Sequence, residues 1–132
     1  MSNAPEVELA VREAVAQTRS CPLEKVQITS NLMDDLGADS LDFLDIVFKI
    51  ERAFKIEITR GEMEQAARGD MSEEEFAPGG VLSEAGLQRL RELMPEAADR
   101  VQPGLRPAAI LRLFSVQTFV NMVRAKLDGR TY

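Results

Sequence analysis

The sequence predicts an all-α fold built as a small bundle of helices. Apolar residues recur at the spacing of a helix in four stretches, residues 5–18, 41–54, 83–94 and 114–127. Capping residues, glycine or proline mark the ends of these stretches. Residues 55–59 are too short and too polar to build a sheet alone.

Length and charge restrict the classes of function. A chain of 132 residues suits one domain with a modest core. The formal net charge of −6 argues against nucleic acid and anionic membranes as partners, and it favours a basic protein surface. No apolar run approaches the roughly eighteen residues of a membrane span, and the N-terminus lacks a signal-peptide pattern. We therefore expect a cytoplasmic monomer without a membrane span.

Catalytic and metal chemistry find little support. The chain has no histidine, which is the commonest general base and metal ligand. The single cysteine, Cys21, precedes Pro22 in a predicted loop, so it has neither a disulfide partner nor a base to activate it. Asp35, Gly37 and Asp39 lack the full ligand series of an EF-hand loop. The sequence predicts neither an enzyme nor a structural metal.

The first predicted helix covers residues 5–18. Pro5 suits an early helical position. One face of this helix is apolar: Val7, Ala10, Val11, Ala14 and Val15. Residues 19–38 then form a long connection, which in a small domain has to pack against the core. It carries five apolar anchors for this purpose: Leu23, Val26, Ile28, Leu32 and Leu36.

The second predicted helix begins after a glycine turn and has Ser40 in its first turn. Gly37 takes a positive φ without steric cost, and Asp39 stands at the N-cap with Asp42 three residues on. The helix runs to Phe54, and we expect it to bury Leu41, Leu44, Val47, Phe48, Ile50 and Phe54. The outward-pointing hydroxyl of Ser40 suits a phosphodiester, which the helix dipole would stabilise. The same spacing fits a second capping residue with no further role.

The run Gly37-Ala38-Asp39-Ser40-Leu41-Asp42 resembles the prosthetic-group attachment motif of acyl carrier proteins, and the similarity extends through Glu57. The resemblance implies a four-helix bundle in which a phosphopantetheinyl transferase, or holo-synthase, attaches the 4′-phosphopantetheine of coenzyme A to Ser40. Asp39 and Leu41 would flank this cofactor-binding residue. The thiol of the attached arm would carry acyl groups as thioesters.

Two further helices complete the expected bundle. Residues 55–59 form a connector whose Ile56 or Ile58 enters the core, and a short helix follows over residues 59–68, ended by glycine. The resemblance resumes at the last helix, residues 114–127. This helix is expected to bury Phe119, Met122, Val123 and Leu127.

The family pattern therefore divides one carrier domain into a core, residues 5–69 and 114–128, and a helical insertion, residues 70–113. Within the insertion Ser83 caps a helix that Pro95 ends. Its apolar face carries Leu87, Leu90, Leu93 and Met94. The insertion either lays this face on the bundle, or forms a wall or lid for an unusual acyl group or a dedicated enzyme.

The resemblance also implies where partners and acyl chains bind. Between residues 31 and 58 the chain has seven acidic and three basic residues, which favours docking onto basic patches of ketoacyl synthase and acyltransferase type enzymes. The expected docking residues are Asp42, Asp45 and Glu51. The expected acyl-chain pocket comprises Leu44, Val47, Ile50, Phe54, Phe119 and Met122. Lys49 and Arg52 interrupt the acidic surface, which favours dedicated partners.

The run Ser-Leu-Asp-Phe-Leu-Asp-Ile, residues 40–46, further resembles carriers that deliver very-long-chain or hydroxylated fatty acids to lipid A. The sequence thus predicts an acyl carrier of a specialised fatty-acid or lipid pathway. Two alternatives stay open. One is a carrier for a polyketide-like secondary metabolite, and the other is an interaction module with the same fold that is never acylated.

Overall fold

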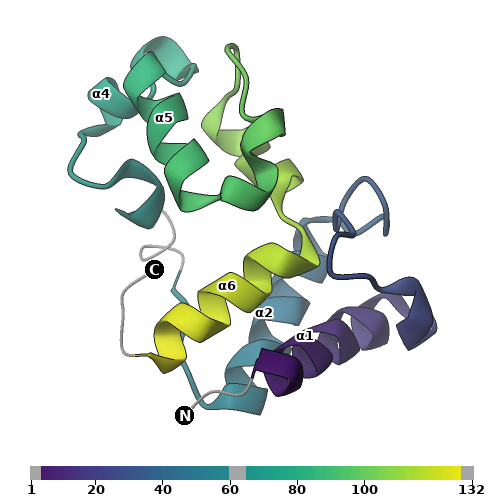
Figure 1. The fold of residues 1–132 in the computed structure, drawn as a ribbon. Coiled ribbons are helices and arrows are strands. Elements are labelled where there is room, and N and C mark those ends of the chain that lie inside the picture. The colour runs from purple at the N-terminus through teal and green to yellow at the C-terminus, as the bar shows by residue number, and fades with distance from the viewer. Residues whose placement is uncertain (1–3, 60–64, 129–132) are drawn as a thin grey trace. The chain divides into compact units, whose positions relative to one another are not determined.

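The computed structural model describes residues 4–59 and 65–128 (Figure 1). These residues confirm the all-α class: they form helices and one isolated antiparallel bridge, between Asn31 and Ser115, and no strand. The α-helices that lie wholly within the described residues are α1 (Ala4–Arg19), α2 (Ser40–Phe54), α4 (Glu73–Phe76), α5 (Glu84–Leu93) and α6 (Val116–Leu127). The 3₁₀ helices are η1 (Leu23–Lys25), η2 (Pro78–Gly80), η3 (Pro95–Arg100) and η4 (Pro107–Leu113).

The chain divides into two compact units. Residues Met1–Ile58 and Phe114–Tyr132 form the first, which we call the Ser40 unit. Residues Thr59–Leu113 form the second, which we call the inserted unit. The Ser40 unit is therefore assembled from two separate pieces of chain.

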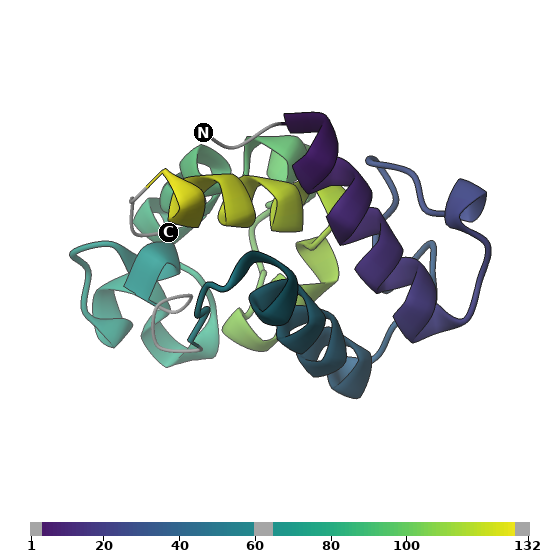
Figure 2. The same cartoon turned by 90° about the horizontal axis from the view of Figure 1, so that it is seen from below.

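Helix α1 is the common neighbour of the other helices in the Ser40 unit, because it packs against both α2 and α6 (Figure 2). Its bounds match the prediction to within one residue at each end. Val7, Val11 and Val15 recur every fourth residue and are at most 1% exposed. Arg12 extends the contact beyond the helix, since its Nε donates to the carbonyl of Val26 (2.6 Å) and its Nη2 to that of Leu23 (3.1 Å). The long connection packs down as expected, with Val26 and Leu32 fully buried.

Helix α2 has the predicted bounds at both ends, but the predicted buried face is wrong for part of its length. The buried residues are Phe43, Ile46 and Ile50. Three residues expected to be buried are exposed instead: Leu41 by 75%, Leu44 by 68% and Phe48 by 54%. Both sets have helical spacing, so the sequence allows either face to be buried. Contact with α1 and α6 selects the face that carries Phe43.

Helix α6 returns the chain to the Ser40 unit through backbone hydrogen bonds at its N-terminal end. The carbonyl of Phe114 accepts from the amide of Leu32 (3.0 Å), and the amide of Val116 donates to the carbonyl of Ser30 (3.0 Å). The rings of Phe43, Phe114 and Phe119 then form a cluster with centroids 5.6–5.9 Å apart. Three of the predicted inward residues are fully buried: Phe119, Met122 and Val123. The prediction fails for Leu127, which is 38% exposed because it stands in the last turn of α6.

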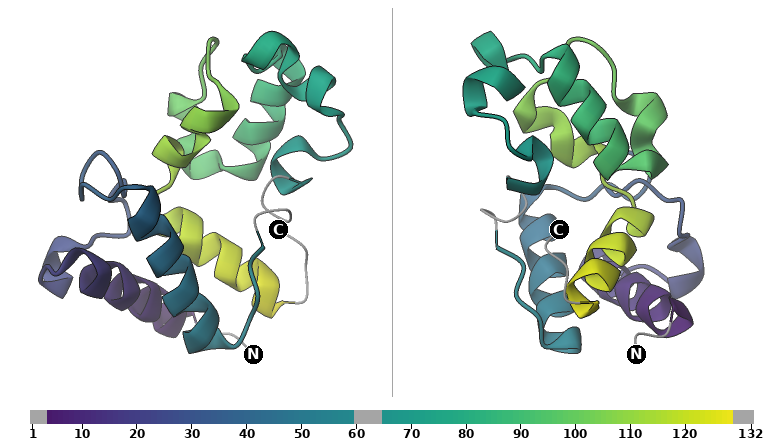
Figure 3. Two further views of the ribbon diagram at one scale, coloured as in Figure 1. Left: turned by 180° about the vertical axis from the view of Figure 1, so that it is seen from behind. Right: turned by 60° about the vertical axis from the view of Figure 1, so that its left-hand side comes forward.

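The inserted unit is a group of short helices, drawn in teal to light green in Figure 3. It has a core of its own. The predicted helix is present as α5, whose N-cap Ser83 accepts from the amide of Gly86, and it ends before Pro95. Gly86 lies so close to the preceding turn that an added Cβ would come within 2.5 Å of the carbonyl oxygen of Phe76. Among its described residues the buried apolar ones are Ala66, Phe76, Leu82, Leu87, Leu90, Met94, Ala97, Val101 and Leu113.

The inserted unit begins at Thr59, earlier than the insertion expected at residue 70. The first part of the short helix predicted over residues 59–68 lies at 60–64, outside the described residues, and residues 65–68 are helical. Arg89 of α5 explains why this helix joins the inserted unit, since its Nε and Nη2 donate to the carbonyl of Ala66 (3.1 and 2.9 Å). Ile58, the last residue of the first piece of the Ser40 unit, is buried as expected for the connector.

The choice of face in α2 is tested by truncating Ile46 and Leu44 separately. Ile46 is fully buried, so we expect Ile46→Ala to lower the free energy of unfolding of the Ser40 unit by about 2–5 kcal/mol. Leu44→Ala, the matched control on the exposed face, should change it by less than about 0.5 kcal/mol. Hydrogen exchange of the α2 amides measures both. Equal losses of protection would mean that Leu44 is part of the core.

Candidate functional site

Ser40 is the first residue of α2, and its side chain is exposed. The capping box predicted around it is present: the amide of Asp42 donates to Asp39 Oδ1 (2.9 Å), and the amide of Asp39 donates to Asp42 Oδ2 (3.0 Å). These bonds satisfy the end of the helix without the serine. Among the described residues none forms a hydrogen bond with the Ser40 hydroxyl. Ser40 therefore presents an exposed hydroxyl, bound by none of the described residues, at the start of a capped helix.

The turn before Ser40 is held by its own hydrogen bonds. Gly37 has φ +69°, the conformation that favours glycine, and its amide donates to the carbonyl of Met33 (3.1 Å). The amide of Ala38 donates to the carbonyl of Leu32 (2.9 Å). The carboxylate of Asp35 closes the other side by accepting from the amide of Asn31 (2.7 Å). The carboxylate of Asp35 is therefore engaged in a hydrogen bond within the loop.

Arg19, which no motif in the sequence marks, connects this turn to two helices. It is the last residue of α1. Its Nε donates to the carbonyl of Leu36 (2.9 Å), and its Nη1 forms an ion pair with Asp42 Oδ2 (3.0 Å). A basic residue in the last turn of a helix normally signals only a favourable interaction with the helix dipole, so the sequence offers no sign of these contacts.

The three acids expected to dock partners all have contacts within the chain. Asp42 takes part in the capping box and pairs with Arg19. Asp45 pairs with Lys49 Nζ (2.6 Å) and accepts from the hydroxyl of Thr18 (3.3 Å). Glu51 accepts from the amide of Ile58 (2.8 Å). Their roles in docking stay a prediction, and their structural roles are set by these bonds.

The hydrogen bond from Lys49 holds the pKa of the Asp45 carboxyl below its ordinary value. The charge of Lys49 and the hydroxyl of Thr18 act in the same direction, and partial desolvation opposes them. Asp45 is therefore ionised at neutral pH, and its charge is largely balanced by the neighbouring lysine.

The residues expected to line an acyl-chain pocket separate into two groups. Ile50, Phe119 and Met122 are fully buried. Val47 and Phe54 are partly buried on the same side of α2. Leu44 lies on the outer face with 68% of its surface exposed, so the expectation that it faces the interior is wrong. The remaining five stay candidates for the pocket.

The fold and this site define a class: a small helical protein with an exposed serine hydroxyl at the first position of a capped helix. Comparison with known proteins agrees. Residues 10–68 match the family described as "Phosphopantetheine attachment site". No solved structure matches the chain.

Curated relatives narrow the class. "Acyl carrier protein AcpXL" of Rhizobium meliloti is 42% identical over 67 residues, which cover 50% of this chain and 70% of the relative. The protein of that name from Brucella melitensis is 48% identical over 48 residues, 36% of this chain and 52% of the relative. "Acyl carrier protein" of Campylobacter hominis is 42% identical over 60 residues, 46% of this chain and 76% of the relative. The chain belongs to the acyl carrier protein family.

The family's prosthetic group is 4′-phosphopantetheine, and the residues around Ser40 fit it. The hydroxyl is exposed and has no hydrogen bond from the described residues, so it is accessible to a transferase. A phosphodiester on it would lie at the positive end of a 15-residue helix. When bound, the group supplies a thiol that carries acyl groups as thioesters.

None of the helices in the described residues has the length and apolar character of a membrane-spanning helix.

The role of Arg19 is tested by Arg19→Gln, which removes the ion pair to Asp42 and weakens the bond to Leu36. We expect the free energy of unfolding of the Ser40 unit to fall by only about 1 kcal/mol, because both partners of the ion pair are partly exposed. Faster hydrogen exchange should be confined to residues 36–42, and the initial rate of arm attachment should fall because the turn before Ser40 opens more often. Arg12→Gln is the matched control, because Arg12 binds other carbonyls of the same connection. Equal effects of the two variants on attachment would refute a specific role for Arg19.

The Asp45–Lys49 pair predicts a dependence on pH. Because the folded pKa of Asp45 is lowered, its stabilising contribution is present above the ordinary carboxyl pKa, about 3.9, and is lost as the pH falls through the folded value. Lys49→Met should shift the carboxyl titration of Asp45, followed by NMR, back toward the ordinary value. Lys25→Met, which removes an exposed lysine elsewhere in the same unit, should leave it in place. An unchanged titration in Lys49→Met would show that Lys49 is not the main cause.

Proposed function

We propose that this protein is a non-catalytic acyl carrier of a specialised fatty-acid or lipid pathway, with Ser40 as the attachment residue and Asp39 and Leu41 as its flanks. One observation carries the proposal: the serine of the attachment motif is exposed at the first position of α2, behind a turn that hydrogen bonds hold in place. A transferase would meet this hydroxyl already in position, which lowers the entropy lost on binding.

The similarity to proteins named AcpXL supports a specialised rather than a general carrier. Together with the Ser-Leu-Asp-Phe-Leu-Asp-Ile run, it favours the delivery of very-long-chain fatty acids to lipid A. The inserted unit is consistent with service to a dedicated enzyme, because it adds a separate core that an acyl carrier unit does not itself need. Coenzyme A, the donor of the arm, favours a cytoplasmic location.

The proposal assigns roles to the start of α2, to its outer face and to the core side chains of the Ser40 unit. The capping box and Arg19 hold the serine in position. The outer face of α2 docks the transferase and then ketoacyl synthase and acyltransferase type enzymes, with Asp42, Asp45 and Glu51 along its margins. An acyl chain would enter the unit by displacing core side chains. The side chains that we expect the acyl chain to displace are Val47, Ile50, Phe54, Phe119 and Met122.

The attachment is tested by incubating the chain with coenzyme A and a broad-specificity phosphopantetheinyl transferase and measuring intact mass. We expect a gain of one phosphopantetheine, and no gain for Ser40→Ala. Ser72→Ala is the matched control, because Ser72 is also an exposed serine at the start of a helix. The Ser72→Ala chain should gain one phosphopantetheine, as the wild type does. The interaction-module alternative would be favoured if the folded wild-type chain gains no mass in this incubation and the protein purified from its own cell also lacks the group.

A further inference from the structure

The outer face of α2 begins as an apolar stripe next to Ser40. Leu41, Leu44 and Phe48 follow one another at intervals of three and four residues and are all more than half exposed. They lie opposite the buried face of the same helix, so they do not contribute to the core of the Ser40 unit. Large exposed side chains in such a row mark a surface for a partner.

The far end of this stripe is positively charged. Arg52 and Lys55 are both exposed, and no carboxylate in the described part of the chain pairs with either of them. The guanidinium of Arg52 lies over the ring of Phe48, 5.5 Å from its centroid, so the cation is attached directly to the apolar stripe. Lys55 is the C-cap of α2, with φ 55°. These two cations are available to a partner, whereas the acids of α2 already have contacts within the chain.

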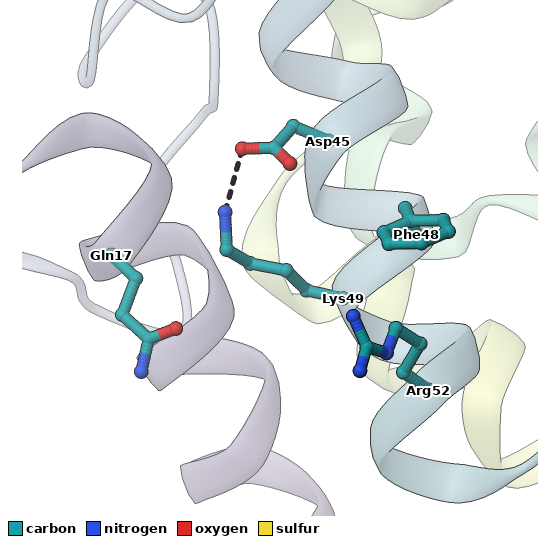
Figure 4. Close-up of a pocket in the computed structure, with 5 residues that line it drawn as sticks. All are labelled: Gln17, Asp45, Phe48, Lys49 and Arg52. Carbon is teal, nitrogen blue, oxygen red and sulfur yellow. Dashed lines mark hydrogen bonds and ion pairs between the residues drawn. The ribbon is translucent and has the colours of Figure 1, made fainter.

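An open pocket of about 420 Å³ lies beside Arg52, between α1 and α2 (Figure 4). Its lining is Gln17, Asp45, Phe48, Lys49 and Arg52. Figure 4 shows Gln17 on α1 across from Lys49 on α2, and the only carboxylate of the lining is joined to Lys49. A visiting carboxylate would therefore meet the guanidinium of Arg52, the amide of Gln17 and the ring of Phe48, beside the ion pair of Asp45 and Lys49. The pocket has room for an aspartate or glutamate side chain.

We propose that α2 docks onto an enzyme surface that has two parts, an apolar cleft for Leu44 and Phe48 and carboxylates that meet Arg52 and Lys55. This inference rests on the proposed carrier function and specifies its partner. The helical rise places Arg52 about 18 Å along the axis from Ser40, so the carboxylates should lie about that far from the entrance for the arm. An enzyme with a uniformly basic docking patch would be disfavoured, because like charges would face each other.

The test uses a β-ketoacyl synthase of general fatty-acid synthesis whose docking patch consists of arginine and lysine. The chain is first loaded on Ser40 with a pantetheine analogue that ends in a chloroacrylamide, and loading is measured by mass. The active-site cysteine thiolate of the synthase then displaces chloride, which leaves a covalent complex that is quantified on a gel. We expect Arg52→Glu/Lys55→Glu to form this complex about tenfold faster than the wild type.

Two controls isolate the charge of this face. Lys25→Glu also adds negative charge to an exposed lysine of the Ser40 unit, away from α2, and should change the rate by less than about twofold. A synthase whose patch is changed from lysine and arginine to glutamate should reverse the preference and favour the wild-type chain. Circular dichroism is used to check that each variant remains helical.

The outcomes separate the two proposals. A chain that cannot be loaded on Ser40 refutes the carrier function and with it the docking partner. A loaded chain whose rate does not respond to Arg52→Glu/Lys55→Glu, or responds equally to Lys25→Glu, refutes only the acidic partner surface. A wild-type dimer that this double variant converts to a monomer would also overturn it, because the cations would then serve contact between two copies of this acidic chain.

Discussion

The contact of Phe114 with Phe43 and Phe119 is the interaction on which the Ser40 unit depends. The chain leaves this unit at Ile58 and returns at Phe114, so α6 has to be bound back by non-covalent contacts. The three rings and the backbone bond between Leu32 and Phe114 provide them at the point of return. Closing a long loop costs only slightly more than closing a short one, so an insertion of this length is tolerated at this point.

The serine end of α2 shows how few side chains are needed to hold the proposed attachment residue in place. Asp42 is used twice, because it completes the capping box with Asp39 and pairs with Arg19. The same arginine holds the carbonyl before Gly37. As a result, Asp39 and Asp42 stabilise the start of α2, and at its other end Arg52 pairs with no carboxylate among the described residues. A surface that is apolar near the serine and basic farther along can discriminate among enzymes more sharply than a uniformly acidic one.

The inserted unit shows where prediction from local pattern reaches its limit. The helix capped by Ser83 and ended before Pro95 was predicted with its bounds, because both signals act over a few residues. The contact of Gly86 with Phe76 and the bond from Arg89 to Ala66 were not predictable, since each joins residues that lie far apart in sequence. These contacts make the insertion a unit with its own core rather than a single added helix.

The sequence by itself determined the helical class, the glycine turn and the capped start of α2 at Ser40. Each of these follows from backbone conformation or hydrogen bonds within a few residues, which a local pattern records. Only the tertiary structure decided that Ile46 rather than Leu44 is buried, because both faces of α2 are apolar and the choice depends on α1 and α6. It also decided which charges are paired, since Arg19 binds Asp42, which lies 23 positions later in the sequence.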